Sequence, residues 1–196
     1  MAIHRLVEQQ AAQDGGRPAI VEGTHVLTYG QLNARANAVA RDLMARGFHR
    51  GGHALVVMER GTELATVLLA VLKAGGCYTW LDPSEGAGYP QGVSITVARA
   101  GDQDVYQVID LPVAQEGPTG PNLPVLIRPS DIAVVLGGNG AGGRIVVPHE
   151  AVLAMRDARM SAQYSWERDA QGFDVWLVLI AGGTLTIDAA VADAAA

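Results

Sequence analysis

The sequence has one cysteine, one lysine and few aromatic residues (5%) among its 196 residues. The single Cys77 excludes an intramolecular disulfide and a zinc site made of several cysteines. Any chemistry that needs a side-chain amine, in a phosphate loop, a Schiff base or acyl transfer, would have to use Lys73. No apolar run is long enough to span a bilayer, and the N-terminus is amphipathic rather than signal-like. We therefore expect a cytoplasmic protein.

Basic charge is also scarce, because 14 Lys and Arg stand against 20 Asp and Glu, for a formal net charge of −6. A general nucleic-acid or anionic-membrane surface needs a basic face, so we expect neither partner. Hydrophobic residues make up 49% of the chain and charged residues 17%, which is enough apolar material for a packed core. The length suits one medium-sized domain, with or without a small appendage.

A β–α–β pattern runs through the first half of the chain. A short apolar strand at 54–58 precedes a helical pattern at 62–74, and a second strand follows at 77–81. Such units build a parallel sheet covered by helices, so the predicted class is α/β, a mostly parallel β-sheet with flanking helices. Further predicted elements are a helix at 3–12, a helix at about 150–163, a helix or strand at 173–180, and strands at 18–21, 25–27, 93–98, 105–111, 132–136, 144–147 and 184–187.

The second predicted helix carries local start and stop signals. Thr28 and Gln31 have the spacing of a capping box, in which the two side chains satisfy the first free backbone N–H groups. Leu32, Val39 and other apolar residues follow at helical spacing, and Gly47 fits the position after the last turn.

Two segments carry a family resemblance. Leu27-Thr-Tyr-Gly-Gln-Leu32 resembles the first core motif of the amino-acid adenylation domains of nonribosomal peptide synthetases. The segment from Leu72 to Pro83 resembles their second motif, with Trp80 in place of a usual proline. The family is the adenylate-forming (AMP-binding) superfamily, which activates a carboxylate with ATP. The resemblance implies the fold of its N-terminal subdomain, and it makes Lys73 the lysine of the second motif, which we interpret as a helix-terminal cation favoured by the helix dipole.

A glycine-rich segment, Gly137 to Arg144, lies where the family has its phosphate-binding loop. It contains no Ser, Thr or Lys and is shorter than the family pattern. It also satisfies G-x-G-x-x-G, but the residues after it are strand-like, which argues against a dinucleotide-binding turn. Backbone N–H groups can still hold an anion, so the candidate residues of this eroded loop are Gly138, Asn139, Gly140, Gly142, Gly143 and Arg144. Asp174 resembles the family's aspartate for the substrate amino group and is the candidate substrate residue.

The resemblance divides the chain into a truncated adenylation-like domain at 1–188 and a low-complexity tail at 189–196. Within the domain, residues 1–83 match well, 84–130 are a shortened connection, and 131–188 hold the degenerate loop region. The family's adenine, ribose and hinge motifs and its C-terminal subdomain with the catalytic lysine lie beyond the end of this sequence.

These features lead us to expect a catalytically inactive unit with a structural or docking role in nonribosomal peptide biosynthesis. It would have no catalytic residue, no metal and no cofactor, and would bind condensation, carrier or similar synthetase domains, or associate with itself. Two alternatives stay open. One is part of a split ATP-dependent amino-acid adenylating ligase completed by a partner, with ATP and Mg²⁺ as cofactors. The other is a small module that binds an anion or nucleotide.

Several single residues have simpler interpretations. His49 and His53 are four apart, but two glycines between them predict a turn, so we interpret them as surface or capping residues rather than metal ligands. Cys77 is expected to be a buried, inert thiol. His149 is expected to have a structural role at a strand end. Core packing is the expected role of the tryptophans, Trp80, Trp166 and Trp176.

Overall fold

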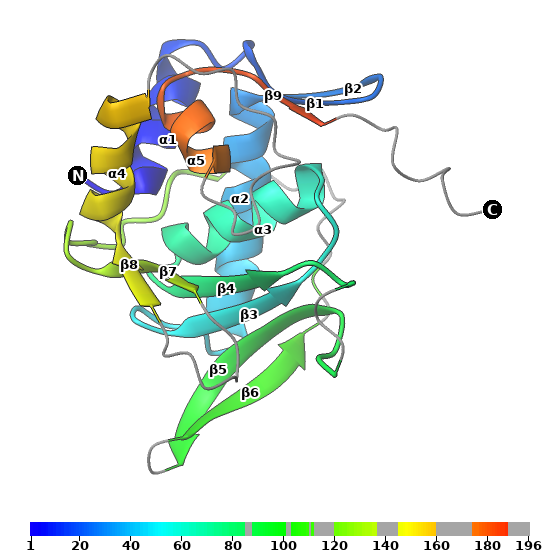
Figure 1. Cartoon of the computed structure of the whole chain (residues 1–196), viewed down its shortest axis with the longest axis vertical. Helices are drawn as coiled ribbons and strands as arrows, with labels where there is room; N and C mark the ends of the chain where they lie inside the picture. Colours follow the sequence, from blue (N-terminus) through cyan, green and yellow to red (C-terminus); the bar gives the residue numbers. More distant parts are fainter. Residues whose placement is uncertain are drawn as a thin grey trace.

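The computed structural model describes residues 1–84, 88–100, 103–109, 111, 120–136, 145–159 and 174–187. Helices are interspersed with strands up to residue 81, and four further strands then precede the last two helices (Figure 1). The helices are α1 (Ile3–Gln13), α2 (Tyr29–Ala45), α3 (Thr62–Lys73), α4 (His149–Arg159) and α5 (Asp174–Ile180). The strands are β1 (Pro18–Glu22), β2 (His25–Thr28), β3 (His53–Val57), β4 (Cys77–Leu81), β5 (Gly92–Ala100), β6 (Gln103–Ile109), β7 (Ile132–Leu136), β8 (Ile145–Pro148) and β9 (Leu185–Ile187).

The main sheet has six strands in the order β6-β5-β3-β4-β7-β8. The α/β class is confirmed, and β3, β4 and β7 are parallel as predicted. The sheet as a whole is mixed rather than mostly parallel, because β5, β6 and β8 join it antiparallel. A parallel pair needs a crossover of about a dozen residues or more, usually a helix. Helix α3 provides that crossover between β3 and β4. The connections from β5 to β6 and from β7 to β8 are too short to contain a crossover.

Helix α3 lies directly over β4 in Figure 1, with the other helices packed around it. Every residue of α3 except Glu63 is buried. A helix that is apolar on nearly all sides has to be enclosed, and here α2, α1 and the sheet enclose it. The predicted helix at 62–74 is confirmed, and it forms the centre of the core.

The capping box at the start of α2 is confirmed. Thr28 Oγ1 accepts the backbone N–H of Gln31 at 3.3 Å, and the Gln31 side chain accepts the backbone N–H of Thr28 at 3.0 Å. Gly47, after the end of α2, has φ +97°, a left-handed conformation that glycine adopts without the penalty of a side chain. Both ends of this helix are therefore set by local sequence.

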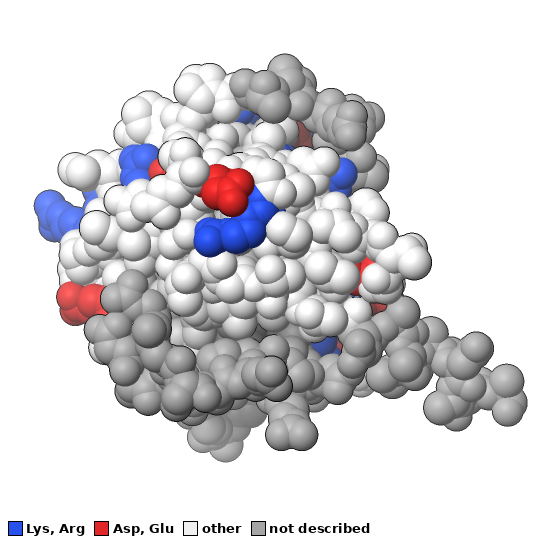
Figure 2. Space-filling view, turned by 90° about the horizontal axis from the view of Figure 1, so that it is seen from above, with Lys and Arg blue, Asp and Glu red and all other residues white. Residues whose placement is uncertain are grey.

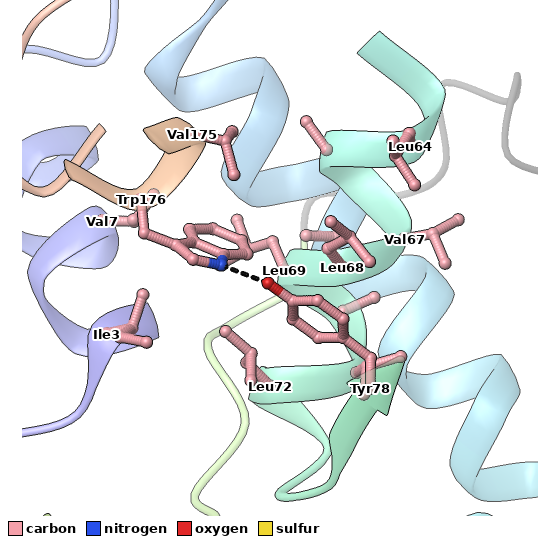
Figure 3. Close-up of a cluster of buried hydrophobic side chains, with 14 of the residues drawn as sticks. Ile3, Val7, Leu64, Val67, Leu68, Leu69, Leu72, Tyr78, Val175 and Trp176 are labelled. Atoms are coloured by element: carbon pink, nitrogen blue, oxygen red, sulfur yellow. Dashed lines mark hydrogen bonds between the residues drawn. The ribbon is translucent and has the colours of Figure 1, made fainter. Parts of the chain in front are cut away.

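The C-terminal segment completes the core. The ambiguous run at 173–180 forms helix α5, whose Trp176 is fully buried and donates its indole N–H to the Tyr78 hydroxyl at 2.6 Å (Figure 3). The Tyr29 hydroxyl lies 2.7 Å from the Gly183 carbonyl oxygen, just beyond α5. Strand β9 then pairs parallel with β1 in a small sheet of order β2-β1-β9. The end of the described chain is thus bound to its beginning.

Candidate functional site

The parallel strands β3, β4 and β7 end at one edge of the main sheet, which we call the carboxyl edge. In open α/β sheets, ligands bind beyond the carboxyl ends of the strands. Arg60 follows β3, Asp82 and Ser84 follow β4, and the predicted glycine segment follows β7. This edge is therefore the candidate site, and its chemistry depends on these side chains.

Arg60 is held in place by an aromatic ring and a carboxylate. Its guanidinium lies 4.8 Å from the centre of the Trp80 ring, and its Nη1 is 3.3 Å from Asp82 Oδ2. The Trp80 indole N–H donates to the Met58 carbonyl oxygen at 2.9 Å, which fixes the ring below the cation. Trp80, which stands where the family has proline, is 5% exposed, so its predicted core packing is confirmed. Sequence reasoning did not single out Arg60, although a cation directly after a strand of this kind was a usable signal.

Asp82 is stabilised as a carboxylate. The Ser84 hydroxyl donates to Asp82 Oδ1 at 2.6 Å, and the Ser84 backbone N–H donates to the same oxygen at 3.0 Å. The hydroxyl contact, then the backbone contact and the Arg60 charge, lower the pKa of Asp82 against a smaller opposing effect of burial. Asp82 is therefore an ionised partner for Arg60 rather than a proton donor.

The N-terminus of α3 also points to this edge, and the protein's own carboxylate fills it. Glu22 Oε2 accepts the backbone N–H of Thr62 at 3.1 Å. A Cβ on the preceding Gly61 would lie 3.2 Å from Glu22 Oε1, which shows how closely this carboxylate approaches. Such helix starts attract anions, and Glu22 occupies the position that a phosphate group would take.

The predicted loop residues Gly138, Asn139, Gly140, Gly142, Gly143 and Arg144 lie outside the described residues, and so does Trp166. Asp174 is the first residue of α5, but its side chain lies outside the described part of the structure. The structure therefore brings together Arg60, Trp80 and Asp82, and it leaves the predicted site residues as predictions.

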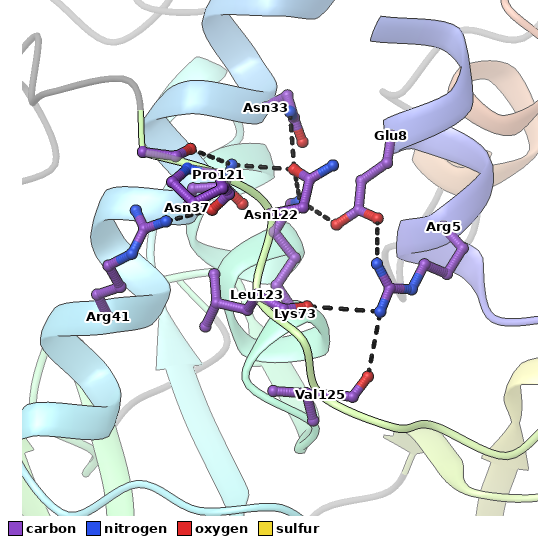
Figure 4. Close-up of polar contacts among 11 residues, drawn as sticks. Arg5, Glu8, Asn33, Asn37, Arg41, Lys73, Pro121, Asn122, Leu123 and Val125 are labelled. Atoms are coloured by element: carbon purple, nitrogen blue, oxygen red, sulfur yellow. Dashed lines mark hydrogen bonds and ion pairs between the residues drawn. The ribbon is translucent and has the colours of Figure 1, made fainter. Parts of the chain in front are cut away.

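The only lysine lies at the opposite end of the strands, which we call the amino edge. Lys73 is the last residue of α3, as expected, yet its side chain is fully buried and its Nζ is 2.5 Å from Glu8 Oε1 (Figure 4). Nζ also lies 3.3 Å from Asn122 Oδ1, and Glu8 is paired with Arg5 at 2.8 Å. The interpretation as a helix-terminal cation is therefore incomplete, because the partner of Lys73 is a carboxylate 65 residues away.

Around Lys73, side chains of three helices hold the segment 120–125. Arg5 of α1 donates to the carbonyl oxygens of Leu123 and Val125 at 3.4 and 3.3 Å. Asn33 and Asn37 of α2 each donate to Asn122 Oδ1 at 3.0 Å. Burial lowers the pKa of Lys73 to about 8, although Glu8 opposes that shift. The Lys73 amine is therefore enclosed within the packed helices and has no access to a ligand.

Three histidines are buried, and the sequence predicted a structural role for only one of them, His149. His149 is fully buried and its Nδ1 accepts the backbone N–H of Ile3 at 3.3 Å, consistent with the expected structural role. The ring of His4 lies 6.1 Å away in an edge-to-face arrangement. Burial, assisted by His149 and Lys73, lowers the pKa of His4 to about 3, and burial lowers that of His149 to about 4.

His53 corrects one prediction. It is 9% exposed rather than a surface residue, and its Nε2 lies 2.9 Å from Thr79 Oγ1 and its Nδ1 2.6 Å from the Tyr106 hydroxyl. Thr79 itself donates to the Val135 carbonyl oxygen, so its hydroxyl accepts from His53. His49 is exposed as predicted, and Cys77 is buried as predicted. The burial of His53 was not predicted from the sequence, because its hydrogen-bond partners belong to β4 and β6.

Within the described residues, no three His, Cys, Asp or Glu side chains gather as metal ligands, and no helix is long and apolar enough to cross a membrane. Among the described residues on the face in Figure 2, the cationic side chains form small separate groups, one of them beside an acidic side chain. The described part of that face shows no continuous basic area of the kind that nucleic acids bind.

Residues 7–92 match a family model described as AMP-binding enzyme. Surfactin synthase subunit 2 of Bacillus subtilis (strain 168) is 30% identical across 94% of this chain and 6% of its own length. Tyrocidine synthase 3 of Brevibacillus parabrevis is 28% identical across 87% of this chain and 3% of its own length. The chain therefore spans only a small part of these curated relatives.

Solved structures show the same fold. The nonribosomal peptide synthetase FmoA3, in its alpha-methyl-L-serine-AMP bound form, has a TM-score of 0.74 and 22% identity over 95% of this chain and 23% of that chain. The N-terminal subdomain of Klebsiella oxytoca NpsA, in complex with 3-hydroxyanthranilyl-AMSN, has a TM-score of 0.68 and 17% identity over 95% of this chain and 53% of that chain. Both show the predicted fold, and the second of them is itself an N-terminal subdomain.

Proposed function

We propose that this chain acts by docking and does not adenylate a substrate. The premise is that residues 7–92 match the AMP-binding family model and that the chain is similar, over nearly its whole length, to nonribosomal peptide synthetases. It would serve as a structural unit in peptide biosynthesis in the cytoplasm. Its partners would be condensation, carrier or similar synthetase domains, or a second copy of itself.

The observation that carries this proposal is the position of Lys73. Adenylation develops negative charge on a transferring phosphate, and catalysis depends on cations placed to meet it. The chain has one lysine, and its amine is buried against Glu8 at the amino edge, away from the candidate site. Arg60, the described cation that follows β3 at the carboxyl edge, is paired with Asp82 over Trp80.

The composition of the glycine segment supports the same proposal. Residues 137–144 offer backbone N–H groups and Arg144, but no hydroxyl and no amine. A guanidinium is a planar fork and does not replace a compact ammonium at a fixed point. Accordingly, the chain on its own would need neither ATP nor Mg²⁺.

Exchange of radiolabelled pyrophosphate into ATP tests the noncatalytic part. The full chain is incubated with ATP, Mg²⁺ and each of the proteinogenic amino acids, beside an intact adenylation domain as positive control. We expect no amino-acid-dependent exchange. Exchange by the chain alone would refute the proposal, and exchange only in a mixture with a protein from a neighbouring gene would favour the split ligase.

Sedimentation velocity tests the docking part. The full chain is run alone over a range of concentrations and then with separately purified carrier and condensation domains from the same gene cluster. We expect either self-association or a complex with one of these domains. A monomer that binds none of them would contradict a docking role and leave the anion-binding module as the better hypothesis.

A further inference from the structure

A cavity of about 540 Å³ opens at the amino edge of the parallel strands, at the other end of the sheet from Arg60 and Asp82. Its lining includes the turns before β3 and β4, the first residue of β4, and the segment that leads into β7. The volume lies within the range of roughly 300–1,000 Å³ that small-molecule sites occupy.

The cavity is lined by one cation and one anion, Arg50 and Asp131. Arg50 Nη2 is 2.7 Å from Asp131 Oδ2, and the same oxygen accepts the backbone N–H of Arg128 at 3.0 Å. The Arg128 N–H, then Arg50, lower the pKa of Asp131, and the charge of Arg128 also acts on it. Asp131 is therefore an ionised partner that pairs with Arg50, the one cation of the lining.

Asp131 orients the Arg50 guanidinium without engaging all of its N–H donors. Asp131 is its only hydrogen-bond partner through the side chain among the described residues, and its side chain is 44% exposed. A guanidinium carries five N–H donors in a rigid fork that matches the two oxygens of a carboxylate. The Arg50 guanidinium can therefore bind a second anion while Asp131 holds the guanidinium in its orientation.

The rest of the lining suits an apolar body. Ile132 is 41% exposed, and Gly51, Gly75 and Cys77 add wall without charge. Burial of this exposed apolar surface would contribute to the free energy of binding. The Arg50 guanidinium of the ion pair at the rim would favour a negatively charged ligand.

We propose that this cavity binds a small organic carboxylate with an apolar body. The carboxylate lies on the free side of the Arg50 fork, the apolar body packs against Ile132, and Asp131 is a positioning residue for Arg50. The site is separate from the carboxyl edge, and it does not depend on the docking role.

Cys77 supplies the readout, because it is the only cysteine of the chain and lines the cavity. The rate of its alkylation by iodoacetamide is measured on the full chain by mass spectrometry, with 4-methylpentanoate as probe and 4-methylpentanamide as its uncharged match. We expect the carboxylate to slow alkylation, about tenfold at ten times its dissociation constant, because only the unoccupied fraction reacts. The amide should leave the rate unchanged.

Matched arginine variants complete the test, each checked for an unchanged melting curve. Arg50→Gln should abolish the protection, and Arg46→Gln, which alters an arginine paired with Asp42 on α2, should not. If Arg50→Gln melts below the assay temperature, Arg50→Lys should give weaker protection than the unaltered chain. Because Cys77 is buried, calorimetric titration of the full chain with the same two probes is run beside the alkylation and gives the binding directly. No binding of the carboxylate, equal binding or protection by the amide, or binding or protection that survives the loss of the Arg50 fork would overturn the proposal.

Discussion

At the amino edge, the Lys73 ammonium is buried against Glu8 and side chains of three helices converge on the segment 120–125. At the carboxyl edge, Arg60 and Asp82 keep about a quarter of their side-chain surface exposed, and the pair rests on a single ring, Trp80. One end of the sheet therefore uses charge to fix helices in place, whereas the other keeps its charge within reach of solvent. Changes at the two ends should have effects of different size and kind.

The largest effect should come from acid, through the histidines near the amino edge. His4 and His149 have folded pKa values of about 3 and about 4, below the value of 6.5 expected in the unfolded chain. Between pH 6.5 and pH 4 the unfolded chain therefore binds protons that the folded chain does not, so stability falls as pH falls. Each histidine should contribute about 1.4 kcal/mol per pH unit in that window.

Urea unfolding at a series of pH values measures this slope. His149→Asn should reduce it, whereas His49→Asn, at an exposed position, should leave it unchanged. A free energy of unfolding that stays flat from pH 7 to pH 4 would show that neither ring is held neutral.

The next largest effect should follow Lys73→Met. Removing the amine leaves Glu8 buried with Arg5 as its remaining ion-pair partner, and breaking a buried ion pair typically costs about 3–5 kcal/mol. The double variant Lys73→Met/Glu8→Leu should recover most of that loss, because no buried charge is left without a partner. Equal melting temperatures for the unaltered chain and Lys73→Met would remove the distinction between the two edges.

A smaller effect is expected from Trp176→Phe, which tests the core between the edges. The variant loses the hydrogen bond to the buried Tyr78 hydroxyl and leaves that hydroxyl short of a donor, a cost of about 1–3 kcal/mol. Tyr78→Phe and the double variant complete a cycle that isolates the coupling between the two side chains. Additive losses would mean that the contact contributes nothing beyond packing.

The smallest effect should follow Arg60→Gln at the carboxyl edge. Its contact with Trp80 and its partly exposed pairing with Asp82 are each worth about 0.5–1 kcal/mol, and salt weakens the pairing. Thermal melts at low and high salt give the comparison. A loss as large as that of Lys73→Met would mean that this edge, too, is structural.

Local patterns made part of this fold predictable. The capping box at Thr28 and the helix at 62–74 depend on neighbouring residues, and both appear as predicted. The antiparallel strands were recognised as strands, but their pairing direction depends on connections rather than on periodicity. The partners of Lys73 and His53 come from distant elements, which a spacing pattern does not reveal. At the candidate site, the glycine segment was recognised by resemblance, whereas Arg60 and Trp80 became a site only through their geometry.

The burial of Lys73 has a practical consequence for chemical labelling. No side-chain amine is present on the folded surface, because the only one in the chain is enclosed with Glu8. An acylating reagent could reach that amine only when α1 and α3 separate. Lysine acylation would then count opening events of the native state at a single site, and its rate would report the free energy of opening when closing is fast.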